Sequence, residues 1–200
     1  MRMLDIVFPE KNEHEFFVMA QQLGYTGLVL VYASKQAADA APKPPAGLRV
    51  KTAVLAEPRK AYQLREKGIL TFVQCSDQDR PVLERGSADV LFGAESTQPK
   101  DYAHQRGAGL NHVMCELAHK NKVAIGFSFA DILATFGSKR AQVLGRMMQN
   151  IRLCRKYKTT MLIGSFAHDP WKMRAPHDMQ SFFITLGMHP VEAKKALMGV

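Results

Sequence analysis

Cysteine, long apolar runs and, over one long segment, acidic side chains are what this chain lacks. Its three cysteines, Cys75, Cys115 and Cys154, are odd in number and widely spaced. This argues against a disulfide framework or a zinc site and indicates reduced, mostly buried thiols. No apolar run approaches the roughly 20 residues that cross a bilayer. The opening sequence, MRMLDIVFPEKNEHE, becomes polar too early for a secretory signal. We therefore expect a cytoplasmic protein that does not enter a membrane.

Acidic residues are absent between Asp131 and Asp169, although this segment carries seven basic ones. These are Lys139, Arg140, Arg146, Arg152, Arg155, Lys156 and Lys158. The whole chain has 27 Lys and Arg against 18 Asp and Glu, a formal net charge of +9. A surface of one charge sign attracts a polyanion. A solvated basic helix without a partner explains the same segment, and this stretch alone does not separate the two interpretations.

Seven short apolar segments alternate with helical patterns along the chain. The expected strands are residues 4–8, 26–32, 49–56, 69–73, 88–92, 122–127 and 160–164. The expected helices are 12–24, 58–68, 80–85, 111–120, 138–157 and 176–186, with a last one opened by Pro190. The stretches 33–47 and 93–110 are expected to be mostly loop, the former with at most a short helix. Such alternation predicts a parallel sheet, and no Gly-x-Gly-x-x-Gly fingerprint of a dinucleotide-binding sheet follows the first strand.

A chain of 200 residues with 46% hydrophobic content can bury one full core. We predict a single domain, residues 1–200, of the α/β class. Its architecture is expected to be a TIM-barrel-like (βα) barrel with about seven parallel strands, because an eight-stranded barrel usually needs about 250 residues.

Catalytic signatures are missing at the carboxyl ends of the expected strands, where barrel enzymes carry them. Only His168 of the seven histidines lies close after a strand, and no cluster of His, Asp and Glu has metal-ligand spacing. The chain has neither a Gly-x-Ser-x-Gly elbow nor a Walker loop. Gly107 and Gly109 indicate a flexible loop that could approach a phosphate, on weak evidence. We predict no catalytic residue and no metal site.

The helix expected over 138–157 has two unlike faces at about 100° per residue. The apolar face consists of Val143, Leu144, Met147, Met148, Ile151 and Cys154, and the polar face of Gln142, Arg146, Gln149, Arg152 and Lys156. We expect the polar face to be exposed, where Arg and Gln suit phosphate and sugar. For Trp171, in a polar loop, we favour a lid packed over the barrel mouth over a platform that stacks on an unpaired base.

Several runs of the chain resemble one known family. They are GLNHVMCELAHKNKVAIGFSFADIL (109–133), RMMQNIRLCRKYK (146–158), PWKMRAPHDMQSFFITLGM (170–188) and, near the start, LDIVFP and LGYTGLVLVY. Together they are similar to the barrel-forming protein subunit of archaeal and eukaryotic ribonuclease P, called component 3 in archaea, and the compact length favours the archaeal branch. The resemblance covers nearly the whole chain.

The family's fold is akin to that of the PHP phosphoesterases, which bind metals through a His-x-His pair at the end of strand one. Val7-Phe8-Pro9 stands at that position here, so the resemblance implies that this metal chemistry is absent. It implies instead a role in the ribonucleoprotein that removes the 5′ leader from precursor tRNA. In that endoribonuclease the RNA performs the cleavage with Mg²⁺.

The polypeptide would then bind and support the catalytic RNA, with no cofactor of its own. Its implied partners are ribonuclease P RNA, precursor tRNA, a small ferredoxin-like protein subunit and other ribonuclease P proteins. The residues carried over as RNA-binding candidates are His112, Lys122, Arg146, Arg152, Lys172 and Arg174, with Arg106, Arg140 and Lys194 added.

Two other functions stay open at this point. The first is a free-standing, metal-dependent PHP-type phosphoesterase, which requires a His, Asp and Glu cluster at one rim of the barrel. The second is a scaffold that binds only proteins, which leaves the acid-free segment 132–168 unexplained.

Overall fold

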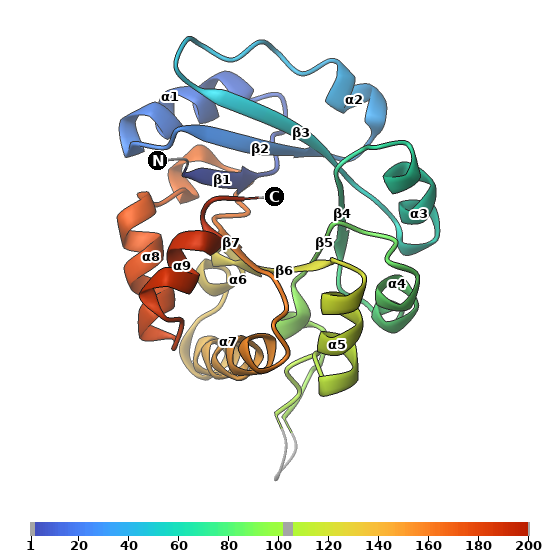
Figure 1. The fold of residues 1–200 in the computed structure, drawn as a ribbon. Coiled ribbons are helices and arrows are strands. Elements are labelled where there is room, and N and C mark those ends of the chain that lie inside the picture. Colours follow the sequence, from blue (N-terminus) through green and yellow to red (C-terminus); the bar gives the residue numbers. More distant parts are fainter. Residues whose placement is uncertain (1–2, 102–105, 200) are drawn as a thin grey trace.

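Seven parallel strands form the centre of the molecule, with helices around them (Figure 1). The structure, a computed structural model, describes residues 3–101 and 106–199. The strands pair in chain order: β1 (Leu4–Val7), β2 (Gly27–Tyr32), β3 (Arg49–Leu55), β4 (Thr71–Gln74), β5 (Val90–Phe92), β6 (Ala124–Ser128) and β7 (Met161–Gly164). Each expected strand overlaps an observed one. The predicted TIM-barrel-like barrel of seven parallel strands is confirmed.

The helices lie outside the ring of strands (Figure 1). They are α1 (Glu13–Leu23), α2 (Lys35–Asp39), α3 (Pro58–Glu66), α4 (Asp79–Arg85), α5 (His112–Lys120), α6 (Phe129–Leu133), α7 (Gly137–Lys156), α8 (Pro176–Thr185) and α9 (Pro190–Ala196). Two single turns of 3₁₀-helix, η1 (Ala94–Ser96) and η2 (Pro170–Lys172), follow β5 and β7. No helix in the described part of the chain is long and apolar enough to cross a membrane.

Backbone contacts just beyond the strand ends close the barrel between β7 and β1. The amide of Phe8 donates to the carbonyl of Ala167 at 2.8 Å, and the amide of Phe166 donates to the carbonyl of Ile6 at 2.8 Å. Asp5 joins this seam, because its Oδ1 accepts from the amide of Ser165 at 2.6 Å. Burial raises the pKa of Asp5 to about 6. The one acid of the first strand is therefore part of the barrel closure.

Large apolar side chains fill the inside of the barrel. Phe92 packs against Phe166 with ring centroids 5.0 Å apart, and Phe8 lies 5.7 Å from Phe92. The ring centroid of Phe72 lies 6.4 Å from the centroids of both Phe92 and Phe166. Truncating such a buried ring to alanine typically costs about 3–5 kcal/mol. The interior is thus a packed core, as is usual for small barrels of this kind.

Local signals at the helix ends explain most element boundaries. Gly24 ends α1 with φ 83°, and Asn111 opens α5 by accepting from the amide of Met114 at 2.9 Å. Asn12 precedes α1 but does not cap it with its side chain. Its side chain instead donates to the carbonyl of His168 at 3.2 Å and accepts from the amide of Glu10 at 2.8 Å.

The short helix α6 was not expected from the sequence. The hydroxyl of Ser128 opens it by accepting from the amide of Asp131 at 3.2 Å. The helix is only five residues long, too short to show a periodic pattern. The following helix α7 begins at Gly137, one residue before the expected cap Ser138.

Candidate nucleic-acid interface

Helix α7 packs its apolar face against the barrel as the sequence predicts. Val143, Met147, Ile151 and Cys154 are buried in the cluster between the sheet and the outer helices, and Leu144 and Met148 are partly buried against it. Cys115 is buried in the same cluster, which fits its interpretation as a packing residue. One face of the longest basic segment is therefore used for folding, and only its remaining faces can meet a partner.

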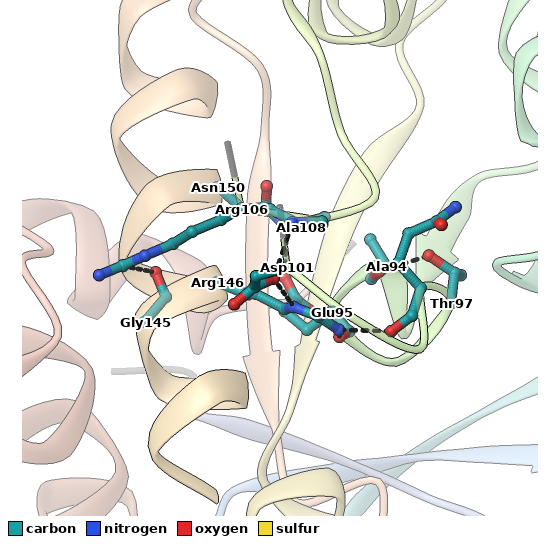
Figure 2. A network of polar contacts seen from close by, with 11 residues as sticks. Ala94, Glu95, Thr97, Asp101, Arg106, Ala108, Gly145, Arg146 and Asn150 are labelled. Atoms are coloured by element: carbon teal, nitrogen blue, oxygen red, sulfur yellow. Dashed lines mark hydrogen bonds and ion pairs between the residues drawn. The ribbon is translucent and has the colours of Figure 1, made fainter. Parts of the chain in front are cut away.

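Arg146 is buried, so the prediction that it lies on the exposed face of α7 is wrong. Its side chain is only 2% exposed. Nη1 donates to the carbonyls of Glu95 and Gln98, each at 2.8 Å, and Nε donates to Asp101 Oδ1 at 2.9 Å (Figure 2). A helical wheel counts every side opposite the core as solvent. Here the segment after β5 covers that side of α7.

Further polar contacts fasten the same segment to α7. Asn150 Nδ2 donates to Glu95 Oε1 and to the carbonyl of Ala108, both at 2.7 Å. Arg106 Nη1 donates to the carbonyl of Gly145 at 2.6 Å (Figure 2). Burial raises the pKa of Glu95 to about 7, although the hydrogen bond from Asn150 opposes the shift. The contacts of Arg106, Arg146 and Asn150 together hold the segment after β5 against α7, and we call this set of contacts the clamp.

The two glycines of this segment serve its packing. Gly109 has φ 80°, and a Cβ there would collide with the backbone of Ala94. At Gly107 a Cβ would lie 2.8 Å from the carbonyl of Lys100. Both positions need the absence of a side chain because the chain folds closely on itself. The weak sequence argument for a phosphate-binding loop is therefore replaced by a structural reason for both residues.

Most of the other predicted RNA-binding residues present their side chains to solvent. Arg106, His112, Lys122, Arg152, Lys172 and Lys194 are exposed, and Arg140 and Arg174 are partly exposed. Arg152 forms no ion pair with any residue that the structure describes. Arg155, by contrast, is held by Glu192, with Nη2 at 2.6 Å from Oε2. Because Arg152 is exposed and pairs with no acid in the described part of the chain, it is the free cation in the middle of α7.

Arg140 and Arg174 contact opposite ends of α6. Arg140 Nε donates to the carbonyls of Ile132 and Thr135, and its guanidinium lies 5.0 Å from the ring of Phe136. Arg174 Nη1 donates to the carbonyls of Trp171 and Met173, and its guanidinium lies 5.7 Å from the ring of Phe129. Arg174 forms no ion pair with Asp169 or Asp178.

The nine candidates do not form one site. Arg140, Lys172 and Arg174 gather near the carboxyl ends of the strands, and Arg106 and Arg152 lie along α7. Lys122 precedes β6 at the opposite end of the barrel, and Lys194 lies on α9. His112 is the first residue of α5. The arrangement suits a large, extended polyanion better than a small ligand.

A cavity of about 360 Å³ opens at the mouth of the barrel. Its apolar lining includes Phe8, Phe92 and Phe166, and its polar lining includes Asp131, His168 and Lys172. His168 Nδ1 lies 3.0 Å from Glu10 Oε1, and its ring stacks on Phe8 at 5.1 Å. Burial raises the pKa of Asp131, whose Oδ1 accepts from the hydroxyl of Ser128.

This mouth does not fit the metal site of the PHP phosphoesterases. Phe8 occupies the end of β1, and it packs against Phe92 and Phe166 instead of presenting a ligand. Within residues 3–101 and 106–199, no three His, Cys, Asp or Glu side chains are placed to hold a metal ion. No metal-dependent step follows from these residues.

Sequence reasoning missed Glu95, Asp101 and Asn150 as parts of the clamp on α7. One signal was present: Asn150 lies three residues after Met147 and four before Cys154, on the apolar side of the helix. A polar residue within an apolar stripe indicates a buried hydrogen-bonding network. The partner of that network could not be identified, because Glu95 is 55 residues away in the chain.

Comparison with known proteins adds independent information. Residues 100–200 match the family described as RNase P subunit p30. The ribonuclease P protein component 3 of Thermococcus gammatolerans is 32% identical over 154 residues, covering 74% of this chain and 68% of that protein. The component 3 of Methanococcoides burtonii is 29% identical over 200 residues, covering 94% and 78%. The component 3 of Methanococcus maripaludis strain C7 is 29% identical, and the match spans 63% of its length.

Solved structures support the same fold. A chain in the cryo-EM structure of archaeal ribonuclease P with mature tRNA has a TM-score of 0.71 at 22% identity, covering 96% of this chain and 86% of that one. The ochratoxinase of A. niger, at 10% identity, has a TM-score of 0.60 and is covered to 69%. The barrel fold thus also occurs in a protein of only 10% identity, whereas the sequence match is specific, and the chain belongs to the RNase P subunit p30 family.

Proposed function

We propose that this chain is a protein subunit of ribonuclease P, the endoribonuclease that removes the 5′ leader from precursor tRNA. In this proposal the RNA subunit performs the cleavage with Mg²⁺, and the polypeptide contributes no catalytic residue and no cofactor. It binds and supports the RNA in the cytoplasm, together with a small ferredoxin-like subunit and other ribonuclease P proteins. Membership of the p30 family and the component 3 relatives support this assignment.

The observation that carries the proposal is the exposed cationic surface of α7 and its neighbours. Arg106, Arg152 and Lys156 are exposed there, and residues 132–168 contain no acid. Lys and Arg that neutralise phosphates release condensed counterions, so binding to RNA would weaken steeply with salt. Structured RNA is recognised mainly by shape and backbone contacts, which matches cations spread over several elements.

The free-standing phosphoesterase finds no support at the barrel mouth. That function needs a constellation of ligands at the rim, and the end of β1 carries Phe8 packed on Phe92 and Phe166. The buried Phe8, Phe92 and Phe166 give the cavity an apolar lining on the barrel side. A subunit that acts through its outer surface requires nothing from this cavity.

Reconstitution tests the proposal. The chain is added with the other protein subunits to the cognate ribonuclease P RNA, and cleavage of precursor tRNA is measured at low Mg²⁺. We expect cleavage that depends on the RNA and increases when this chain is present, and none with the chain alone. Chelator-sensitive hydrolysis of a phosphoester by the chain alone would overturn the proposal. So would equal cleavage with and without the chain.

A further inference from the structure

An exposed apolar groove lies between α1 and the turn η2. Trp171 is 78% exposed and Val18 is 55% exposed. They line a groove of about 470 Å³ together with His14, Glu15, Met19, Gln22 and Pro170. The lid that the sequence suggested for Trp171 is thus not observed, because the residue is exposed and lines this groove and not the mouth cavity. An exposed tryptophan beside an exposed valine and a methionine marks a binding surface.

The walls of the groove are held in place before any partner binds. At one end of the segment 168–174, Asn12 Nδ2 donates to the carbonyl of His168 at 3.2 Å. At the other end, the hydroxyl of Tyr25 donates to the carbonyl of Arg174 at 2.8 Å. Met173 is buried in the same cluster as Phe16 of α1. A preformed surface loses little conformational entropy on binding, so more of the contact energy appears as affinity.

The backbone of Trp171 is also fixed. Its amide donates to Asp169 Oδ1 at 3.0 Å, and its carbonyl accepts from Arg174 Nη1 at 3.2 Å. The 3₁₀ turn therefore presents the indole outward from a rigid support. Tryptophan and methionine are enriched at the buried centres of protein–protein interfaces, where truncation of one anchor often costs most of the affinity.

Charge separates a protein partner from RNA at this groove. Residues 12–34 contain no Lys or Arg, in a chain that has 27 of them. The first turn of α1 carries Glu13 and Glu15, and Glu15 lines the groove. The cations after Trp171 already have contacts: Lys172 lines the mouth cavity, and Arg174 donates to the carbonyl of Trp171 and lies over Phe129 of α6. Within the groove itself, a base stacked on Trp171 would bring its phosphates toward the carboxylate of Glu15.

We propose that the groove between α1 and η2 is the docking site of another protein subunit of the same particle. The partner inserts apolar side chains against Trp171 and Val18 and places Lys or Arg opposite Glu15. This inference rests on the proposed function for the identity of the particle. Its surface is distinct from the cations of α7, which lie on another side of the ring of helices (Figure 1).

Trp171 is the only tryptophan of the chain, so it can report its own burial. The chain is labelled with 5-fluorotryptophan, which leaves the tryptophans of unlabelled partners silent in ¹⁹F NMR. Each purified protein subunit of the cognate ribonuclease P, and the RNA alone, is then added in turn. We expect one protein subunit to shift the ¹⁹F resonance and to protect it from broadening by a soluble paramagnetic agent. RNA alone should leave the resonance unchanged.

Two matched substitutions measure the contribution of the groove. Val18→Ser removes an exposed valine inside it, and Val191→Ser removes one on α9 that is 63% exposed and outside it. We expect Val18→Ser to weaken the protein partner several-fold and Trp171→Ala to weaken it by about tenfold or more, with Val191→Ser unchanged. Both groove residues are exposed, so the variants should keep the wild-type melting temperature.

Other outcomes overturn the inference. Protection of Trp171 by RNA alone would make it a stacking platform. Protection that grows with the concentration of this chain alone would indicate a contact between copies. No protection by any subunit would leave the groove without a role in the particle. Salt-dependent RNA binding is measured on the same variants, so a failed docking site is separated from a failed ribonuclease P assignment.

Discussion

Helices α1 and α7 have opposite charge patterns on the same barrel. Helix α7 and the segment around it carry only basic charges, whereas α1 carries Glu13 and Glu15 and no Lys or Arg. The two helices lie on different sides of the ring (Figure 1). Both helices pack apolar residues into the core, α1 in one cluster and α7 in another, and α7 is also held by the buried contacts of Arg146 and Asn150. This difference in charge is the basis of the two proposals made above, a polyanion at α7 and a protein at α1.

The comparison also shows that charge in the sequence is not the same as charge on the surface. Arg146 is buried in the clamp on Glu95, Gln98 and Asp101, and Arg155 pairs with Glu192. Only part of the basic run is therefore available to RNA. On α1 the carboxylate of Glu13 accepts from the hydroxyl of Tyr32 at 3.2 Å, which leaves Glu15 as the acid that lines the groove.

The largest expected effect separates the structural from the exposed arginines of α7. Arg146→Ala removes the donor shared by Asp101 and two carbonyls, so the free energy of unfolding should fall by about 3 kcal/mol. Arg146→Lys should also destabilise, since an ammonium cannot reproduce the guanidinium fork. Denaturant titration measures both. The control Arg152→Ala should stay within about 0.5 kcal/mol of wild type; equal stability of the Arg146 and Arg152 variants would contradict the clamp.

The next effect contrasts the buried acid beneath α7 with the exposed acid on α1. Folding raises the pKa of Glu95 from 4.5 to about 7, so the folded state binds this proton more tightly than the unfolded chain. Its contribution to stability is then fully present below about pH 4.5 and is lost as the pH rises toward 7. Glu95→Gln keeps an oxygen for Asn150 and removes the titration.

We therefore expect the unfolding free energy of wild type, minus that of Glu95→Gln, to fall by roughly 2 kcal/mol between pH 4.5 and 7. Chemical denaturation at a series of pH values gives this difference. Glu15→Gln, on the exposed face of α1, is measured beside it as the matched variant. A flat difference for Glu95→Gln would mean that this carboxyl is not desolvated by the fold.

The smallest expected effect concerns RNA binding itself. Arg152→Ala with Lys156→Ala removes two exposed cations of α7, and the slope of log affinity against log salt should decrease by about 1–2. Lys60→Ala, an exposed cation on α3 that pairs with Glu57, should leave the slope unchanged. Binding of the cognate RNA at several salt concentrations measures both. The reverse pattern would place the RNA on the α3 side of the barrel.

Much of the fold could be predicted because its signals are local. Most strands are short apolar runs buried on both faces, such as Leu28 to Val31, and they need no knowledge of their neighbours to be identified. Glycine and asparagine at the ends of α1 and α5 are signals of the same kind. The five-residue helix α6 was missed because a single turn has no periodicity.

The candidate site could be predicted only in outline. The excess of basic residues is a property of composition and was visible at once. Whether a given arginine is free depends on which distant segment folds over it, as Glu95 and Asp101 do at Arg146. The surroundings of Trp171 could not be predicted for the same reason. Its neighbours in the groove, Val18 and Met19, are about 150 positions away in the chain.

The sequence by itself determined the barrel, the family and the opposite charges of α1 and α7, because apolar patterning, motif similarity and charge are properties of short segments. The tertiary structure decided which charges remain exposed, why Gly109 must be glycine and where Trp171 points. Those outcomes depend on contacts between segments far apart in the chain, and only the closed barrel brings such segments together. That closure also sets the different surfaces that α1 and α7 present.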